Sequence, residues 1–234
     1  MDSKFRFDVP LYTVAEAART VGVPATTFAT WAKGYVRHPQ GRRQVRGLAV
    51  VKSIDSGQGE PSIPFVGLAE GLVLAAVRRS GVPMQRVRPA LAALEGELGV
   101  AHALASRRLY TDGAEVLFDY GQLHAERSEI IGQLVVVRNG QRVFTEVIAD
   151  YLRRIEYSDD GYASLIRLPA YAGEVICDPT RSYGRPIFVR GGAKVDDVLS
   201  RFQAGESLDE LRAEFGVTEA DLEDALRVAS RRAA

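Results

Sequence analysis

The chain has 234 residues, of which 46% are hydrophobic, and its 30 basic and 30 acidic side chains give a formal net charge of zero. This hydrophobic fraction supports a folded core and excludes wholesale disorder. No apolar run approaches the roughly 20 residues that cross a bilayer, and residues 1–12 lack the pattern of a signal peptide. The single cysteine, Cys177, excludes an internal disulfide, so we expect a soluble protein of the reducing cytoplasm.

The charges are distributed unevenly along the chain. Residues 1–54 carry nine Lys or Arg and three acidic residues, whereas residues 195–224 carry ten acidic residues against Arg201 and Arg212. Such asymmetry favours one module that faces a polyanion and another with a different task.

Residues 11–34 have the pattern of two short helices joined by a tight turn. Thr13 followed by Glu16 is a capping-box signature, so the first helix is predicted to begin at Val14. Its apolar residues recur at helical spacing up to Gly22, which is predicted to end it.

The second helix is predicted to begin near Pro24, because proline fits the first turn of a helix. Its inward-facing residues are predicted to be Phe28, Trp31 and Ala32. Two short helices joined by a glycine turn form a helix-turn-helix. A Gly-, Pro- and Arg-rich stretch follows Gly34 and leads to a predicted strand at residues 48–51, which suggests a wing.

The wing and the second helix supply the candidate DNA-binding residues. The wing alternates basic side chains with Gly, Pro and Gln, so it should remain solvated, and arginine offers paired donors to phosphate. An ordinary solvated loop is the alternative, which the position after a helix-turn-helix disfavours. The helix threonines could contact bases or phosphates, or could be surface residues without a role. The candidates are Thr13, Thr26, Thr27, Thr30, Lys33, Arg37, His38, Arg42, Arg43 and Arg46.

Two further helices are predicted over residues 65–81 and 82–95, where they would cover the helix-turn-helix. Val87, Leu91 and Leu94 are expected to face inward in the second of them.

The middle of the chain is predicted to form strands rather than helices. Asp112-Gly113 and Asn139-Gly140 lie between apolar runs and predict two β-hairpins, because both dipeptides favour the two-residue turn that matches strand twist. A last strand is predicted over residues 162–168, completing a small antiparallel sheet.

The C-terminal section is predicted to return to helix. An apolar stripe runs from Val195 to Phe202 and is closed by Gly205. Ser207 with Glu210 is a second capping box, and a third helix is predicted to begin at residues 218–221.

No catalytic residue, metal site or cofactor site is predicted, so we expect a protein that is not an enzyme. The histidines, His38, His102 and His124, have no partner at metal-ligand spacing. Cys177 lies in no CxxC pair and is expected to be buried. Most acidic residues of 196–224 fall in the first turns of predicted helices, where they stabilise the helix N-terminus.

The stretch Tyr12-Thr-Val-Ala-Glu-Ala-Ala-Arg19, with Gly22-Val-Pro24 and the segment from Phe28 to Gly34, resembles the MerR-type winged helix-turn-helix. With the next two helices the resemblance spans about residues 11–110. It implies that the helix from Pro24 to Lys33 enters the major groove and that the wing around Arg37 to Arg46 grips phosphates. The chain departs from MerR regulators in having threonines where they often carry arginine, and in lacking their dimerising coiled coil.

Residues 174–230 resemble the domain-of-unknown-function 433 family, whose members are commonly described as VapB-type antitoxins. The resemblance rests on Val175-Ile-Cys-Asp-Pro, Gly184-Arg-Pro-Ile-Phe-Val-Arg-Gly-Gly, Val195-Asp-Asp-Val-Leu and Ala204-Gly-Glu-Ser-Leu. It implies a toxin partner with a PIN-like ribonuclease fold and autoregulation of the operon.

These observations predict a mainly α protein with a small antiparallel β part, of the α+β class. Its expected parts are a DNA-binding domain at 1–108, a β region at 109–172 and an antitoxin-family domain at 173–234. The predicted function is that of a homodimeric antitoxin and repressor that binds double-stranded DNA and a toxin. The alternative is a stand-alone MerR-like regulator with an effector or partner site in the middle region.

Overall fold

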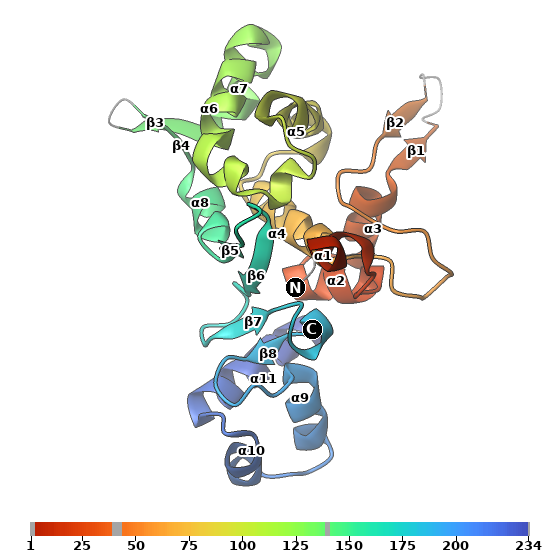
Figure 1. Cartoon of the computed structure of the whole chain (residues 1–234), viewed down its shortest axis with the longest axis vertical. Coiled ribbons are helices and arrows are strands. Elements are labelled where there is room, and N and C mark those ends of the chain that lie inside the picture. The colour runs from red at the N-terminus through yellow and green to blue at the C-terminus, as the bar shows by residue number, and fades with distance from the viewer. Residues whose placement is uncertain (1–2, 39–43, 139–140, 234) are drawn as a thin grey trace. The chain divides into compact units, whose positions relative to one another are not determined.

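The computed structural model describes residues 3–38, 44–138 and 141–233 (Figure 1). The chain forms two compact units, Met1–Ala163 and Ser164–Ala234. Helices predominate in both, with small antiparallel sheets, which confirms the predicted α+β class. The finer division at residues 108 and 172 stays a prediction. No described helix is long and apolar enough to span a membrane.

The N-terminal unit carries the predicted helix-turn-helix, its wing and a set of covering helices. Its elements are α1 (Ser3–Asp8), α2 (Val14–Val21), α3 (Ala25–Lys33), β1 (Tyr35–Arg37), β2 (Val45–Gly47), α4 (Phe65–Arg79), α5 (Met84–Leu98), η1 (Ala103–Ala105), α6 (Arg107–Leu123), α7 (Ala125–Gly132), β3 (Val135–Arg138), β4 (Gln141–Phe144), α8 (Glu146–Leu152) and β5 (Ile155–Tyr157).

Helix α2 begins and ends where the sequence predicts. The Glu16 N–H donates to Thr13 Oγ1 over 3.2 Å, and the Thr13 N–H donates back to the Glu16 carboxylate over 2.8 Å, which completes the capping box. Gly22 ends the helix in the left-handed conformation at φ 76°. In α3 the predicted inward residues Phe28, Trp31 and Ala32 are all buried.

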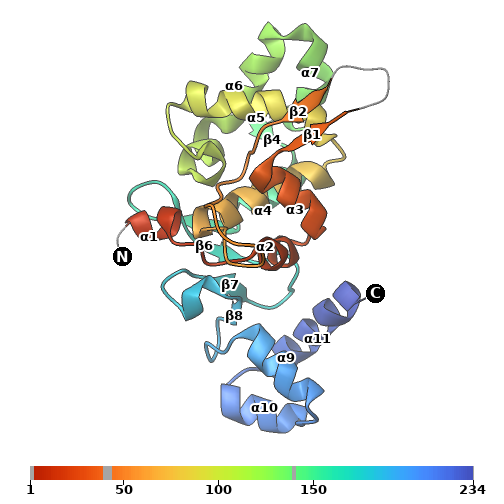
Figure 2. The same ribbon diagram turned by 90° about the vertical axis from the view of Figure 1, so that its right-hand side faces the viewer.

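The wing is a hairpin, but its second strand lies earlier than predicted. Strand β2 pairs antiparallel with β1, so that Val36 faces Arg46. The prediction of a strand at residues 48–51 is wrong, because this segment packs on the helix-turn-helix instead: the N–H groups of Val50 and Val51 both donate to Trp31 O, over 2.8 and 3.1 Å. Figure 2 shows the hairpin extending from the end of α3, away from α2.

Helix α4 is the centre of this unit. Every residue from Phe65 to Val77 is buried, and the helix contacts α1, α2, α3, α8 and η1. Helix α5 follows it, with Leu91 and Leu94 buried as predicted; the side chain of Val87 lies outside the described residues. Helix α4 packs against α2 and α3 and so provides the predicted cover over the helix-turn-helix, whereas the main contacts of α5 are with α6, α7 and η1.

The prediction of the first middle hairpin, at Asp112-Gly113, is wrong. Asp112 and Gly113 lie inside helix α6, where Leu109 and Leu117 are buried at helical spacing. Gly113 permits close packing there, since a Cβ atom would lie 2.8 Å from the Leu109 side chain. The second hairpin is confirmed by the antiparallel pairing of β3 with β4, although its turn, 139–140, lies outside the described residues.

The C-terminal unit joins a small sheet to three short helices. Its elements are β6 (Ala163–Arg167), β7 (Val175–Cys177), η2 (Ser182–Gly184), β8 (Ile187–Phe188), α9 (Val195–Gln203), α10 (Leu208–Phe215) and α11 (Glu219–Ala233). Strand β6 confirms the predicted strand at 162–168 and pairs antiparallel with β7, which pairs antiparallel with β8. The prediction that this strand completes one sheet with the middle hairpin is wrong, because β3 and β4 form a separate two-stranded sheet. The three predicted helices are all present.

A glycine turn holds this sheet close to the helices. Gly191, at φ 75°, lies so near α10 that a Cβ atom would stand 1.9 Å from Phe215 O. Any larger residue would force the two backbones apart, which gives the Gly191-Gly192 pair a structural role. Cys177 is fully buried, and this burial raises the pKa of its thiol, so the side chain stays protonated.

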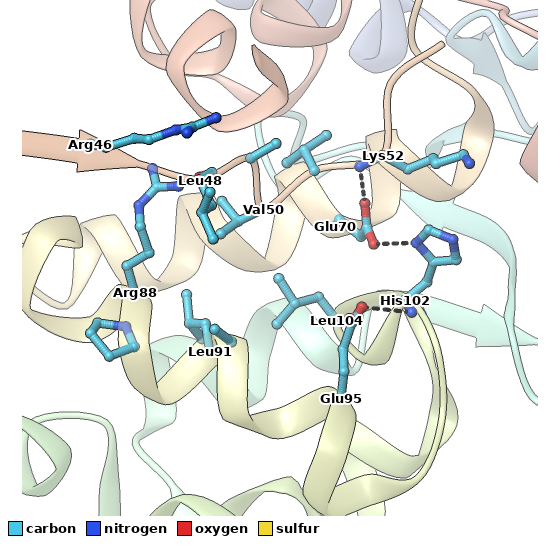
Figure 3. Close-up of a pocket in the computed structure, with 14 residues that line it drawn as sticks. Arg46, Leu48, Val50, Lys52, Glu70, Arg88, Leu91, Glu95, His102 and Leu104 are labelled. Carbon is cyan, nitrogen blue, oxygen red and sulfur yellow. Dashed lines mark hydrogen bonds and ion pairs between the residues drawn. The ribbon is translucent and has the colours of Figure 1, made fainter. Parts of the chain in front are cut away.

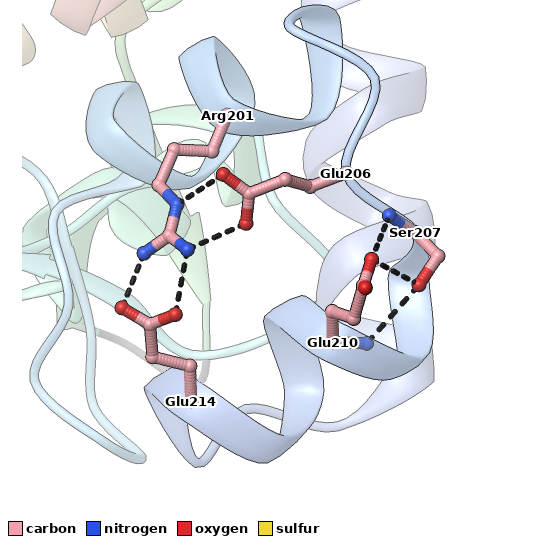
Figure 4. Close-up of polar contacts among 5 residues, drawn as sticks. All are labelled: Arg201, Glu206, Ser207, Glu210 and Glu214. Carbon is pink, nitrogen blue, oxygen red and sulfur yellow. Dashed lines mark hydrogen bonds and ion pairs between the residues drawn. The ribbon is translucent and has the colours of Figure 1, made fainter.

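An ionic network joins α9 to α10 (Figure 4). The Arg201 guanidinium donates two hydrogen bonds to Glu206, over 2.6 and 2.5 Å, and also binds both oxygens of Glu214. This contact lowers the pKa of the Glu214 carboxyl. Next to it, Ser207 and Glu210 form the predicted capping box of α10. The network therefore fixes the turn between the two helices.

One buried carboxylate ties α4 to its surroundings. Glu70 is 3% exposed; it accepts a hydrogen bond from the Lys52 N–H over 2.5 Å and lies 3.1 Å from His102 Nδ1. The Glu70 carboxylate raises the pKa of His102, and burial raises the pKa of Glu70 itself. Glu95 also raises the His102 pKa, while Lys52 lowers it.

We predict that Gly67→Ala destabilises the protein by about 1–3 kcal/mol, because the new methyl group overpacks the core. A Cβ atom on Gly67 would lie 2.3 Å from Lys52 O, a main-chain atom that cannot rotate away. The matched control is Gly96→Ala, at an exposed position of α5 where no atom lies within 4 Å of the new Cβ atom; this variant should gain about 0.5–1 kcal/mol. Urea unfolding measures both, and equal effects would contradict this packing.

We also predict that stability falls as the pH rises through the raised pKa of His102. The folded state binds protons more tightly than the unfolded chain, so the stabilisation is complete below about 6.5, the ordinary histidine pKa, and is lost above the raised value. The raised pKa of Glu70 likewise makes the stability fall as the pH rises through that pKa.

His102→Gln should therefore flatten the dependence of the unfolding free energy on pH between about 6 and 8. The control is His124→Gln, since Nδ1 of His124 lies 3.0 Å from the main-chain oxygen of Tyr120 rather than from a carboxylate. Chemical unfolding at a series of pH values measures the slopes. An unchanged slope in His102→Gln would show that the pair does not titrate with folding.

Candidate nucleic-acid interface

The outer face of α3 is polar and carries one cation. Thr26 is exposed, and Thr27 and Thr30 are half-buried, with the Thr30 hydroxyl donating to Thr27 O over 2.7 Å. Lys33 is the exposed last residue of the helix. The helix therefore offers short hydroxyl groups along its length and a positive charge at its end, where the chain turns into the wing.

The wing adds Arg46 and His38 as exposed side chains, while the side chain of Arg37 lies outside the described residues. Arg37 ends β1 and pairs with Val45, while Arg46 is exposed on β2. His38 follows β1 and is exposed. The candidates Arg42 and Arg43 lie outside the described residues.

Thr13 stands apart from the other candidates. Its hydroxyl is half-buried and engaged with Glu16 in the capping box of α2. In the structure Thr13 therefore caps the N-terminus of α2, which packs against α3.

Two arginines from later helices meet the threonine face of α3. A hollow of about 270 Å³ is lined by Thr26, Thr27, Thr30, Trp31, Tyr35, Arg78, Met84 and Arg88. Arg78 Nη1, from α4, donates to Thr27 Oγ1 over 3.2 Å. Arg88, from α5, lies over the Tyr35 ring at 5.6 Å and donates to Leu48 O.

The sequence patterns do not indicate a role for these two arginines. Arg78 and Arg88 are 51 and 40 residues distant from their partners Thr27 and Leu48, so helical periodicity gives no sign of the contacts. They bring cationic groups to the face where α3 itself has only threonines. Arginine donors of this kind suit phosphate oxygens.

The described residues do not form the pattern of a metal site. Among them no three His, Cys, Asp or Glu side chains gather as metal ligands would. The exposed hydroxyl and cationic groups around α3 and the wing are instead suited to bind a polyanion.

Comparisons with known proteins agree with this arrangement. Residues 10–91 match a family model described as "Putative DNA-binding HTH domain", and residues 175–229 match "Protein of unknown function (DUF433)". The first match covers the helix-turn-helix, the wing and α4, and the second covers most of the C-terminal unit.

Relatives of similar length come from Mycobacterium tuberculosis (strain ATCC 25618 / H37Rv). The chain is 46% identical over 228 residues to "Putative antitoxin VapB45", covering 95% of both chains. It is 26% identical over 229 residues to "Uncharacterized protein Rv2308", covering 94% of this chain and 90% of that one.

A solved structure also matches, titled "X-ray crystal structure of Rv2018 from Mycobacterium tuberculosis". Its TM-score is 0.82 at 43% sequence identity, over 94% of this chain and 99% of that chain. The full-length identity and the two domain matches together decide the family. The chain belongs to the VapB-type antitoxins that combine a DNA-binding helix-turn-helix with a DUF433 domain.

Proposed function

We propose that this antitoxin represses its own operon as a homodimer and neutralises a toxin with a PIN-like ribonuclease fold. The observation that carries the DNA-binding half is the joining of α3, the wing and Arg78 in one packed unit with hydroxyl and cationic groups on its outer face. A cytoplasmic location, a MerR-like mode of docking and a role without catalysis belong to the same proposal.

The DNA-binding mode follows from the size of α3. With nine residues, a single recognition helix buries too little surface to select one site in a genome. A twofold dimer would present two such helices to half-sites one helical turn apart, about 34 Å. In this mode the threonines of α3 face base edges, and Lys33, Arg37, His38, Arg42, Arg43 and Arg46 face phosphates.

The toxin-binding half is supported by the C-terminal unit. Asp196, Asp209 and Glu219 are exposed in the first turns of α9, α10 and α11. A ribonuclease must attract RNA phosphates and therefore needs a positive surface around its active site. An acidic antitoxin surface would complement that surface and block it.

The competing hypothesis is a stand-alone regulator with no toxin. A small ribonuclease that co-purifies with the chain when the two neighbouring genes are expressed together favours the antitoxin. A dimer without a partner, whose operator affinity depends on a ligand, favours the regulator.

We predict that Arg42→Ala, Arg43→Ala and Arg46→Ala together weaken binding to every duplex sequence. Each lost phosphate contact should reduce the slope of log affinity against log salt by about 0.9. Fluorescence anisotropy with the upstream DNA of the gene, at several salt concentrations, measures affinity and slope.

The matched control for the wing variant replaces Arg107, Arg108 and Arg153 by alanine. These three arginines are exposed in the same unit, on α6 and after α8, and their loss removes the same charge. The control should keep the wild-type slope. An unchanged slope in the wing variant would remove the wing from the interface.

We further predict that Asp196→Asn, Asp209→Asn and Glu219→Gln together weaken toxin binding by at least about tenfold, or 1.4 kcal/mol, and leave DNA affinity unchanged. Calorimetry with the purified product of the neighbouring gene measures the first effect. The control is Glu146→Gln with Asp150→Asn, two acidic residues of α8 in the other unit. Equal toxin affinity in both variants would contradict an acidic toxin-binding surface.

A further inference from the structure

An open apolar groove runs through the N-terminal unit, between the chain that leaves the wing and helix α5 (Figure 3). Its volume is about 520 Å³, within the range of small-molecule sites. Figure 3 shows Leu48, Val50, Leu91 and Leu104 between two charged ends. Leu48 is 65% exposed, an unfavourable position for a large apolar side chain that a ligand would cover.

One end of the groove is cationic. Arg46 and Arg88 line it together, and no acidic side chain in the described part of the chain pairs with either. Arg88 also has a buried Nε with no hydrogen-bond partner among the described residues. Such an unsatisfied buried donor is unfavourable, and an anion beside the guanidinium would offset its partly buried charge.

The other end of the groove carries charges of both signs. Glu70, Glu95, His102 and Lys52 line it. Here the carboxylates are already engaged, since His102 Nδ1 lies 3.1 Å from Glu70 and the main-chain N–H of His102 donates to Glu95 over 2.8 Å. An anionic head is therefore better placed at the first end, where no carboxylate of the described residues offsets Arg46 and Arg88.

We propose that this groove binds an amphiphilic monoanion, such as a free aliphatic carboxylic acid. Its anionic head lies against the guanidinium groups of Arg46 and Arg88. Its apolar body covers Leu48, Leu91 and Leu104.

The groove is connected to the wing through the same residues. Arg88 contacts Tyr35 of β1 and the Leu48 carbonyl just after β2, and Arg46 is itself part of β2. An anion held between these arginines neutralises the root of the wing. This consequence, unlike the binding itself, rests on the proposed DNA-binding function: ligand and DNA phosphate compete for Arg46, so the ligand weakens operator binding.

Calorimetry of the full chain without DNA tests the site directly. The probes are decanoate, decan-1-ol and decanedioate, each well below its aggregation concentration. Decanoate should bind at least about tenfold more tightly than the other two, since decan-1-ol lacks the anion and decanedioate brings a second, unpaired carboxylate into the apolar part of the groove. Equal binding of all three, or none, would overturn the proposal.

Variants separate the groove from other apolar surfaces. Leu48→Glu places a carboxylate inside the groove and should abolish decanoate binding, whereas Leu123→Glu, at a leucine 82% exposed at the end of α6, should leave it intact. Arg46→Met should reduce the preference for decanoate over decan-1-ol. Loss of binding in Leu123→Glu, or retention in Leu48→Glu, would contradict the assigned site.

Anisotropy with operator DNA then tests the regulatory consequence. Decanoate should weaken DNA binding by the wild type and not by Leu48→Glu. Decanoate binding without any effect on DNA binding would overturn the competition for Arg46 and leave the ligand site standing. Failure of the chain to bind DNA at all would refute the proposed function, while the calorimetry still decides the groove.

Discussion

Helix α4 is apolar around most of its circumference, so its stability depends on the neighbouring elements that bury it. Its one carboxylate, Glu70, is buried as well and fixes where two of these neighbours lie. Glu70 satisfies the Lys52 N–H and contacts His102, and thereby fixes both the chain that returns from the wing and the turn before η1. Gly67 lets the same chain approach α4 at backbone distance. The position of the wing thus depends on the burial of α4 as much as on its own two short strands.

The candidate DNA-binding surface is assembled from segments distant in sequence. Helix α3 provides threonines and one lysine, the described part of the wing provides Arg46, and α4 and α5 add Arg78 and Arg88. Arg88 contacts Tyr35 of β1 and the Leu48 carbonyl just after β2, and it therefore links α5 to the wing. A small domain of this kind can present an ordered cationic surface without the long coiled coil of MerR regulators.

Short sequence patterns predicted the elements whose ends depend on hydrogen bonds within one helical turn. Capping boxes at Thr13 and Ser207 located the starts of α2 and α10, because a cap satisfies donors within one turn. The Asp112-Gly113 signal failed because buried contacts of Leu109 and Leu117 outweigh a turn preference. Arg78, Arg88 and the groove could not be predicted, since they depend on how helices far apart in sequence pack. Arg42 and Arg43 remain candidates from the sequence alone.

We propose that this antitoxin recognises duplex DNA mainly through phosphate contacts around α3 and the wing. The most direct test measures the affinity of the wild-type chain for its upstream duplex over a series of salt concentrations, alone and with the product of the neighbouring gene. We expect log affinity to fall linearly with log salt, with a slope of several times about −0.9. Absence of binding in dilute buffer under both conditions, or an affinity independent of salt, would contradict it.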